Sequence, residues 1–186
     1  MKRQIRHTIA LLLAAFLALS VAADDAGWRD SEGKPLADTG ARRFANGFGA
    51  WLIARSSPAT APPSQSRARL ADAVANEKRV LARGEALVPV IFVLNAGRDA
   101  SGNADVSCGL RFTRPDGSEE RSYALRCVTG PIEGGTEDLR QAPVPIEFFA
   151  TPEDAAGTWS IEAVVYDRVR DRTITVATSF ELSDAV

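Results

Sequence analysis

Residues 105–127 read DVSCGLRFTRPDGSEERSYALRC, and this stretch decides the fold class. Apolar side chains and Cys108 occupy every second position before the tetrad Arg114–Gly117, and the same period of two resumes after it as far as Cys127. Successive side chains of a β-strand alternate between its two faces, so this period predicts two strands with one apolar face each. The tetrad Arg-Pro-Asp-Gly is typical of a tight turn, because proline fixes φ and glycine accepts a positive φ. The stretch therefore predicts a β-hairpin with one face in the core.

The two cysteines of this hairpin, Cys108 and Cys127, both fall on its apolar face. They lie directly opposite each other if the connection is a four-residue loop, Asp116–Glu119, whereas a two-residue turn would place Tyr123 opposite Cys108. Two thiols that face each other form a disulfide in an oxidising compartment, so we expect the longer loop and a structural bridge, with two buried free thiols as the alternative. The chain has no C-x-x-C spacing and no histidine nearby, which argues against a redox-active pair.

The first 23 residues have the layout of a secretory signal peptide. Lys2, Arg3 and Arg6 precede an apolar run of 15 residues that closes with small side chains before Asp24, so we expect cleavage after Ala23. The run is shorter than the roughly 20 residues that span a bilayer, which predicts no membrane span after cleavage; a retained N-terminal anchor is the alternative. We therefore expect a periplasmic or secreted protein.

Removal of residues 1–23 changes the charge and the chemistry of the chain. It takes away three of the 22 basic residues and none of the 24 acidic ones, so the formal net charge falls from −2 to −5. It also removes His7, the only histidine. Without a histidine, the remaining chain has no base for Ser-His-Asp or Cys-His catalysis. It also has no imidazole ligand for zinc, copper or iron. An acidic chain also has no general electrostatic reason to bind nucleic acid. We expect no catalytic residue, no metal ligand and no cofactor.

Six further stretches are short, β-branched or aromatic, and bounded by Gly, Pro, Asn or Asp. They are Phe48–Ala54, Arg79–Arg83, Leu87–Leu94, Pro143–Ala150, Thr158–Tyr166 and Thr173–Leu182. Together with the hairpin they predict an all-β antiparallel sandwich of about seven to nine strands in residues 48–186. Residues 24–47 are rich in Gly, Asp and Arg and predict an irregular N-terminal arm. For residues 67–79, helix and loop both remain open.

The stretch Leu87–Leu94 is apolar at every position, so both of its faces are hydrophobic. Either a partner covers the second face, or the N-terminal arm does so with Trp28 or Phe44. Pro89 lacks a backbone donor and indicates an edge or a bulge at this point. The possible partner surface consists of Leu87, Val88, Val90, Ile91, Phe92 and Val93.

Several polar patterns have a simpler explanation than a site. Asp99–Asp105 places a side chain with an oxygen atom at every second position, as the first half of a calcium-binding loop does. The glycine and the glutamate that such a loop needs further along are missing, so the pattern favours a polar loop over a calcium site. The acidic pairs Glu119–Glu120 and Glu137–Asp138 give weak support to a carboxylate hydrolase. In Asp167–Arg172 the alternating charges offset one another, which predicts a solvated hairpin end.

Two further stretches carry a resemblance to a known family. Arg83-Gly84-Glu85 comes before an apolar strand, and Glu153–Glu162 places a glycine and a tryptophan at the start of a strand that runs to Tyr166. These residues, with the Phe-Gly-Ala-Trp-Leu start at Phe48, resemble small secreted bacterial proteins built from one immunoglobulin-like, macroglobulin-type β-sandwich domain. The resemblance implies an immunoglobulin-like fold and, in general terms, binding or scaffolding. The cysteines depart from the antibody pattern, since no tryptophan lies between them and their bridge would staple a hairpin.

Taken together, these features predict a non-enzymatic binding or scaffolding module, a monomer or weak dimer, whose partner is an unknown envelope or secreted protein. Binding would use a sheet edge or the apolar face of Leu87–Leu94. A second hypothesis is an inhibitor or immunity protein whose loop Gly130–Gln141 enters the cleft of an envelope enzyme or toxin. The third, a carboxylate-based hydrolase, has the least support.

Overall fold

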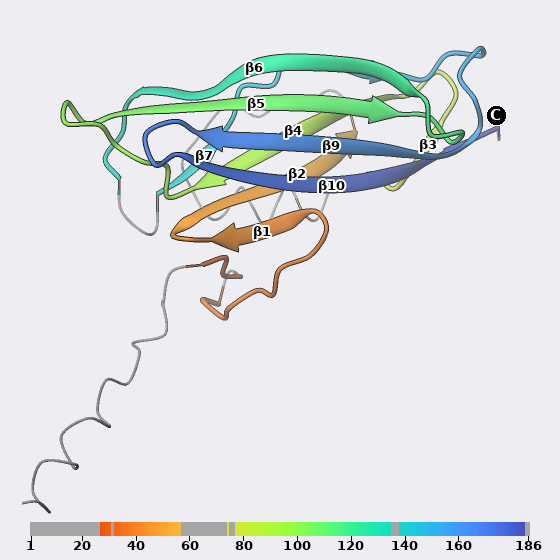
Figure 1. Cartoon of the computed structure of the whole chain (residues 1–186). Coiled ribbons are helices and arrows are strands. Elements are labelled where there is room, and N and C mark those ends of the chain that lie inside the picture. The colour runs from red at the N-terminus through yellow and green to blue at the C-terminus, as the bar shows by residue number, and fades with distance from the viewer. Residues whose placement is uncertain (1–26, 31, 57–73, 75–76, 135–137, 185–186) are drawn as a thin grey trace, which may run out of the picture.

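Ten strands make up the part of the chain that the structure, a computed structural model, describes (Figure 1). This part comprises residues 27–184 apart from 31, 57–73, 75–76 and 135–137. The strands are β1 (Arg42–Ala45), β2 (Phe48–Ser56), β3 (Val80–Ala82), β4 (Ala86–Leu94), β5 (Asn103–Thr113), β6 (Glu119–Pro131), β7 (Leu139–Gln141), β8 (Phe148–Phe149), β9 (Gly157–Asp167) and β10 (Arg172–Ser183). The predicted signal peptide, and residues 67–73 of the stretch left open between helix and loop, lie outside the described residues.

The strands form two sheets that pack face to face. The first sheet has the order β1-β2-β4-β7, with the short β8 paired to the other end of β4, and the second has the order β3-β10-β9-β5-β6. All pairs are antiparallel except β3 with β10, which is parallel. The expected all-β, mainly antiparallel sandwich is therefore confirmed, and the additional strands are short pieces at the sheet margins.

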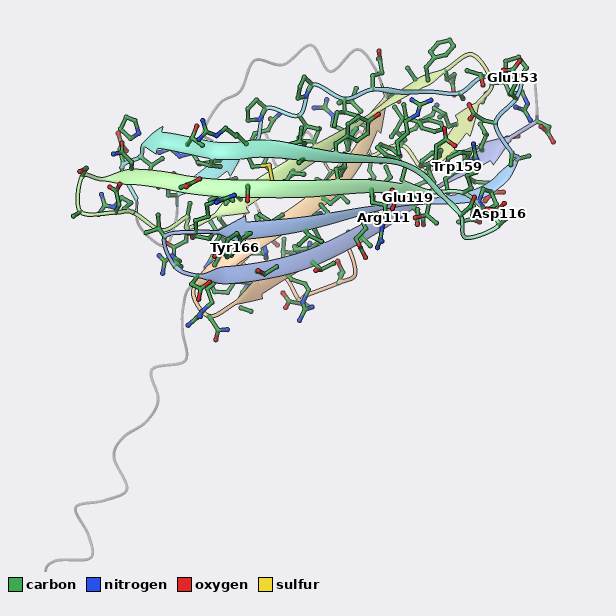
Figure 2. The ribbon with its side chains drawn as sticks, turned by 45° about the horizontal axis from the view of Figure 1, so that its top comes forward. Arg111, Asp116, Glu119, Glu153, Trp159 and Tyr166 are labelled. Atoms are coloured by element: carbon green, nitrogen blue, oxygen red, sulfur yellow. A yellow bond between two sulfur atoms is a disulfide. The ribbon has the colours of Figure 1, made fainter. Side chains whose placement is uncertain are left out.

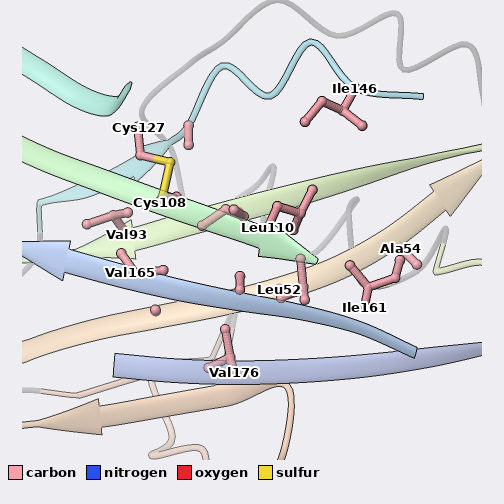
Figure 3. Packing of buried hydrophobic residues seen from close by; sticks show 14 of the residues in the cluster. Leu52, Ala54, Val93, Cys108, Leu110, Cys127, Ile146, Ile161, Val165 and Val176 are labelled. Atoms are coloured by element: carbon pink, nitrogen blue, oxygen red, sulfur yellow. A yellow bond between two sulfur atoms is a disulfide. The ribbon is translucent and has the colours of Figure 1, made fainter. Parts of the chain in front are cut away.

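The main core lies between the two sheets and follows the alternation seen in the sequence. In β5 the even-numbered side chains from Ala104 to Phe112 are buried, while the odd-numbered ones are half-buried or exposed. In β10, Ile174, Val176, Phe180 and Leu182 are buried in the same way. Figure 3 shows Cys108, Leu110 and Val176 of this set between the sheets, together with side chains of β2 and β4 such as Leu52 and Val93. At one end Phe148 packs against Trp159 and Phe180, with ring centroids 4.9 and 5.2 Å away.

Strand β4 is buried on both faces, and the second face is covered by the chain itself. Its odd-numbered side chains lie in the main core, whereas Val90, Phe92 and Leu94 form a second cluster on the outside of the first sheet. Trp28 of the N-terminal arm covers this cluster: it is 3% exposed, meets Trp51 edge-on at 5.5 Å, and donates from Nε1 to the carbonyl of Arg43 at 3.0 Å. The hypothesis of a partner surface on this strand is corrected accordingly. Five of its six residues, Leu87, Val90, Ile91, Phe92 and Val93, are almost fully buried, and Val88 is half-buried.

Two local predictions differ from the structure. The arm is not wholly irregular, because Arg42–Ala45 forms β1 and pairs with β2 through the turn at Asn46 and Gly47. Residues 143–150 do not form one strand; their only strand is Phe148–Phe149, since Pro143 and Pro145 lack backbone donors, and Leu139–Gln141 pairs with β4 instead.

The edge indicated by Pro89 is present, because its backbone faces the side of β4 where β7 and β8 leave a gap. Ile91, two residues further along β4, turns its carbonyl to the same side, where it accepts from the amide of Ala142 at 2.8 Å. Pro89, which has no backbone N–H, therefore faces a part of β4 with which no strand pairs in the described chain, so no ladder hydrogen bond is lost there.

The hairpin end at Asp167–Arg172 is only partly solvated. Asp167 is 0% exposed, and its carboxylate accepts from the backbone amides of Gly97, Val169 and Arg170 at 2.7, 3.0 and 3.0 Å. The side chain of Arg170 adds an ion pair to Asp167 at 3.6 Å and donates to Asn95. This carboxylate thus joins the β9–β10 hairpin to the loop after β4, a tertiary role that a run of alternating charges does not reveal.

Replacement of Asp167 by alanine is expected to destabilise the fold by about 3 kcal/mol, because three backbone amides, that of Gly97 buried, lose their acceptor and Arg170 loses its counter-charge. Urea unfolding followed by tryptophan fluorescence measures this loss. Asp105→Ala is the matched control, since Asp105 is half exposed and its pair with Arg168 is 3.8 Å long. Equal stability of the two variants would contradict a buried role for Asp167.

Aspartate at either face of β4 is expected to unfold the domain. Val90→Asp and Ile91→Asp each bury an unpaired carboxylate, one under the arm and one between the sheets, at a cost of more than about 4 kcal/mol. Val164→Asp, on the exposed face of β9, serves as the control and should keep the native circular dichroism spectrum. A folded Val90→Asp protein would mean that the arm leaves this face open.

Candidate functional site

Strand β6 forms one edge of the second sheet and is open along its outer side. It is 13 residues long and pairs only with β5 among the described residues (Figure 1). An edge of this kind presents unpaired amide and carbonyl groups and is a template for another strand. The outer side of β6 is therefore the candidate functional site.

The backbone groups that face outward can be identified from the neighbouring strand. The carbonyl of Asp105 accepts from the amide of Arg168 at 2.9 Å, so the odd-numbered residues of β5 face β9 and the even-numbered ones face β6. Leu110, which faces β6, lies opposite Tyr123. By alternation the amide and carbonyl groups of Ser122, Ala124 and Arg126 point away from the sheet, available to another strand.

The other margins of the sandwich are closed by local contacts. The outer side of β10 is paired with β3, and further along the amide of Ala177 donates to the carbonyl of Gly40 at 2.7 Å. The outer amides of β1 donate to side chains of the arm, Arg42 to Thr39 and Phe44 to Asp38. On the remaining margin β7 and β8 are only three and two residues long. Among the described strands, β6 thus offers the longest open edge.

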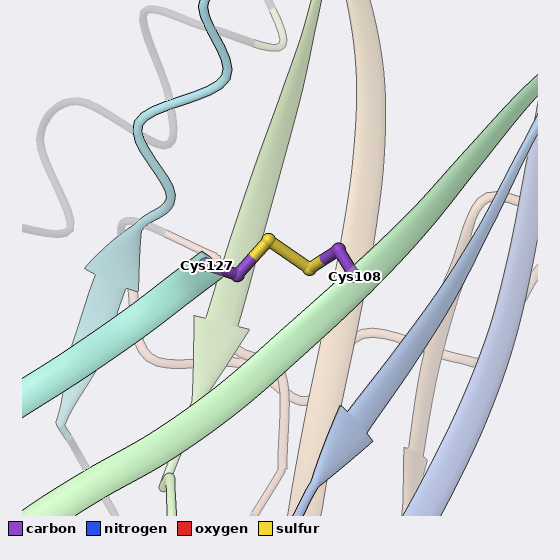
Figure 4. Close-up of a disulfide and its surroundings, with 2 residues drawn as sticks. All are labelled: Cys108 and Cys127. Carbon is purple, nitrogen blue, oxygen red and sulfur yellow. A yellow bond between two sulfur atoms is a disulfide. The ribbon is translucent and has the colours of Figure 1, made fainter. Parts of the chain in front are cut away.

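The disulfide between Cys108 and Cys127 is present, with Cα atoms 5.8 Å apart, and links β5 to β6 (Figure 4). The predicted register is wrong, however, because Cys108 lies opposite Leu125. Cys127 is an extra residue in a bulge of β6, between the partners of Val106 and Ser107. From this bulge its sulfur still reaches Cys108, so the bridge ties the open strand to the body of the sheet.

The reason for the changed register lies in the turn. Thr113 pairs with Glu119, and the amide of Gly117, at φ +85°, donates to the carbonyl of Arg114 at 2.9 Å, which confirms the turn expected at this tetrad. The carboxylate of Asp116 accepts from the hydroxyl and the amide of Ser118 at 2.6 and 2.8 Å, and these bonds lower its pKa. The connection is therefore residues 114–118, and a second bulge in β6 follows it between the partners of Phe112 and Thr113.

Charged side chains frame the open edge at the turn end of β6. Glu120, the extra residue of the second bulge, pairs with Arg114 and, at 3.4 Å, with Arg121. On the neighbouring strands β5 and β9, Arg111, labelled in Figure 2, pairs with Glu162 at 2.5 Å. This end of the sheet is therefore ordered by ion pairs that leave the backbone of residues 122–126 uncovered.

The other residues considered in the sequence do not assemble into a site. Asp99 accepts the amides of Asn103 and Ser101, which lowers its pKa and makes it the acceptor of its own turn. Asp138 pairs with Arg140 at 2.6 Å, while Glu137 lies outside the described residues. The segment 130–141 is not a free loop as a whole, since Leu139 is buried in β7.

No group of three or more His, Cys, Asp or Glu side chains in the described part of the chain is placed to hold a metal ion. No helix in the same part is both long enough and apolar enough to cross a membrane.

Comparisons with known proteins find similarity at the level of solved structures. No family model and no curated protein matches the chain. A family 123 glycoside hydrolase from Clostridium perfringens is 14% identical with a TM-score of 0.44, over 73% of this chain and 28% of the enzyme, so the chain spans under a third of that protein. The C-terminal domain of Wzt is 9% identical over 78% of both chains, also with a TM-score of 0.44. An immunoglobulin-like protein from Pseudomonas aeruginosa is 12% identical over 70% of this chain and 96% of that one, with a TM-score of 0.31.

Loss of the disulfide is expected to lower stability and to loosen β6. The bridge joins residues 19 positions apart, and a closed loop of this size contributes about 3 kcal/mol in the chain-entropy model. The double variant Cys108→Ala/Cys127→Ala should lose this amount in urea unfolding, and amide exchange in residues 121–128 should accelerate. Reduction of the natural protein serves as the second arm. Unchanged exchange in β6 would show that the bridge does not anchor the edge.

Proposed function

We propose that this protein is a non-enzymatic binding or scaffolding module that is exported and holds a protein partner by strand addition to β6. The single observation that carries the proposal is the open outer edge of this strand, where the amide and carbonyl groups of Ser122, Ala124 and Arg126 face away from the sheet. In strand addition an extended segment of a partner completes the ladder, and main-chain hydrogen bonds supply much of the affinity.

The alternative binding surface considered for this module, the second face of β4, has no room for a partner while the arm is in place. Trp28 and Trp51 already fill that face, and Val90 is 2% exposed. Strand addition to β6 requires no rearrangement of either core. Of the two binding modes inferred from the sequence, the sheet edge is thus the one that we propose.

Export to the periplasm or the medium forms part of the same proposal. The signal-peptide pattern in residues 1–23 supports it, and so does the bridge between Cys108 and Cys127, since disulfides persist in oxidising compartments. The resemblance to secreted macroglobulin-type domains also supports it. We therefore place the partner among envelope or secreted proteins, which meet this module after export.

Proline at position 124 tests the proposed edge. Because the amide of Ala124 faces outward, Ala124→Pro removes a donor needed by an added strand while leaving the ladder to β5 intact. The exported protein is used to capture partners from an envelope extract, and a captured partner is then titrated against each variant. We expect Ala124→Pro to weaken binding by about tenfold or more, since an added strand would lose one main-chain bond and fit poorly against the ring.

Ala124→Val is the matched control, because it keeps the donor and favours a strand, and it should bind as the natural protein does. Amide exchange of residues 122–126 should slow when the partner is added. A partner that binds Ala124→Pro as tightly as the natural protein would contradict strand addition at this edge.

A further inference from the structure

The outer edge of β6 carries two charges of opposite sign that make no ion pair in the described part of the chain. Glu119 begins the strand beside the turn (Figure 2), and Arg126 lies one residue before the disulfide; both are exposed. Their neighbours have partners, since Glu120 is paired with Arg114 and Arg121. Glu119 and Arg126 are thus the charges that this edge offers to whatever pairs with it.

A second copy of β6, laid antiparallel along this edge, brings these two charges together. Hydrogen-bonded pairs form between outward-facing residues, so Ser122 of one copy lies opposite Ala124 of the other, and the twofold axis passes beside Tyr123. Glu120 is an extra residue in a bulge, so in the ladder only Arg121, which faces β5, lies between Glu119 and Ser122, and Glu119 is the outward-facing residue before Ser122. In this register Glu119 faces Arg126 of the second copy, and the symmetry repeats the pair.

Neighbouring registers do not make this match. If the axis passes at Ala124, Arg126 lies opposite Ser122 of the second copy, and Glu119 lies opposite Thr129, the next outward-facing residue after Arg126 because Cys127 is the extra residue of its bulge. If the axis passes at Ser122, Glu119 lies opposite Ala124 and Arg126 reaches the turn. Opposite charges that are directly opposed across a ladder stabilise the pair, and like charges destabilise it. The charges of β6 therefore select one register of self-pairing.

We propose that the protein forms a weak symmetric dimer in which two β6 strands pair antiparallel about Tyr123 and join two sandwiches into one continuous sheet. This inference rests on the proposed function, because it names a second copy of the chain as an occupant of the same edge. The paired stretch spans residues 119–126 only, a short contact that joins two sheets by their edges and lacks the large apolar area of obligate dimers. The dimer therefore dissociates on dilution, and a partner strand competes with it.

Sedimentation equilibrium of the exported protein over a wide concentration range tests the dimer. We expect a reversible monomer–dimer equilibrium that Glu119→Arg and Arg126→Glu each weaken by about tenfold, because each change opposes two pairs of like charges. The double variant Glu119→Arg/Arg126→Glu should restore association. Glu153→Arg and Arg172→Glu change the net charge equally at exposed positions away from β6 and should leave association unchanged.

Two outcomes overturn the dimer: a natural protein that stays monomeric at every concentration, or a double variant that associates no better than the single ones. The same variants separate this inference from the proposed function. Partner binding that depends on Ala124, in a protein that never dimerises, refutes the dimer alone. If the single charge variants weaken the dimer and the double variant restores it, while Ala124→Pro leaves partner binding unchanged, the proposed function alone is refuted.

Discussion

Strand β4 has no polar face, and much of the architecture follows from that constraint. Ile91 and the other odd-numbered apolar side chains of β4 are buried between the sheets. Without further cover, Val90, Phe92 and Leu94 would be exposed to water on the opposite face of the first sheet. Trp28 of the N-terminal arm packs on this outer face and covers these side chains, so the first sheet is buried on both faces. A soluble monomer seldom leaves so large an apolar patch open, and here the cover comes from the arm.

Because the faces are closed by packing, the edges remain as places where the backbone can interact. Most margins are satisfied locally, by β3 and Gly40 along β10 and by Thr39 and Asp38 along β1. Strand β6 differs, since its two bulges and the disulfide fix its path without covering its outer amides. The protein binding and the self-pairing proposed for this edge would use the same unpaired groups and would therefore compete.

The parts of the fold that were predictable are those controlled by local pattern. The alternation in β5 and β10, the turn at Arg114–Gly117 and the pairing of the cysteines are properties of short segments, in which side-chain period and turn chemistry act directly. The register of β5 against β6 was not predictable, because the extra residues in β6 depend on contacts such as that of Glu120 with Arg114. The buried position of Asp167 was not predictable for the same reason, since its carboxylate accepts from the amide of Gly97, which is remote in sequence.

The sequence by itself determined that the chain is a β-sandwich with a bridged hairpin, and that no histidine follows His7, since strand period and residue inventory are one-dimensional properties. It also showed that Leu87–Leu94 needs cover on both faces, without deciding what supplies it. Tertiary structure alone decided that Trp28 supplies this cover and that β6 is left open, because burial and edge exposure depend on which distant segments meet in space. The location of the proposed site therefore follows from topology, because only the topology places Glu119 and Arg126 together on an open edge.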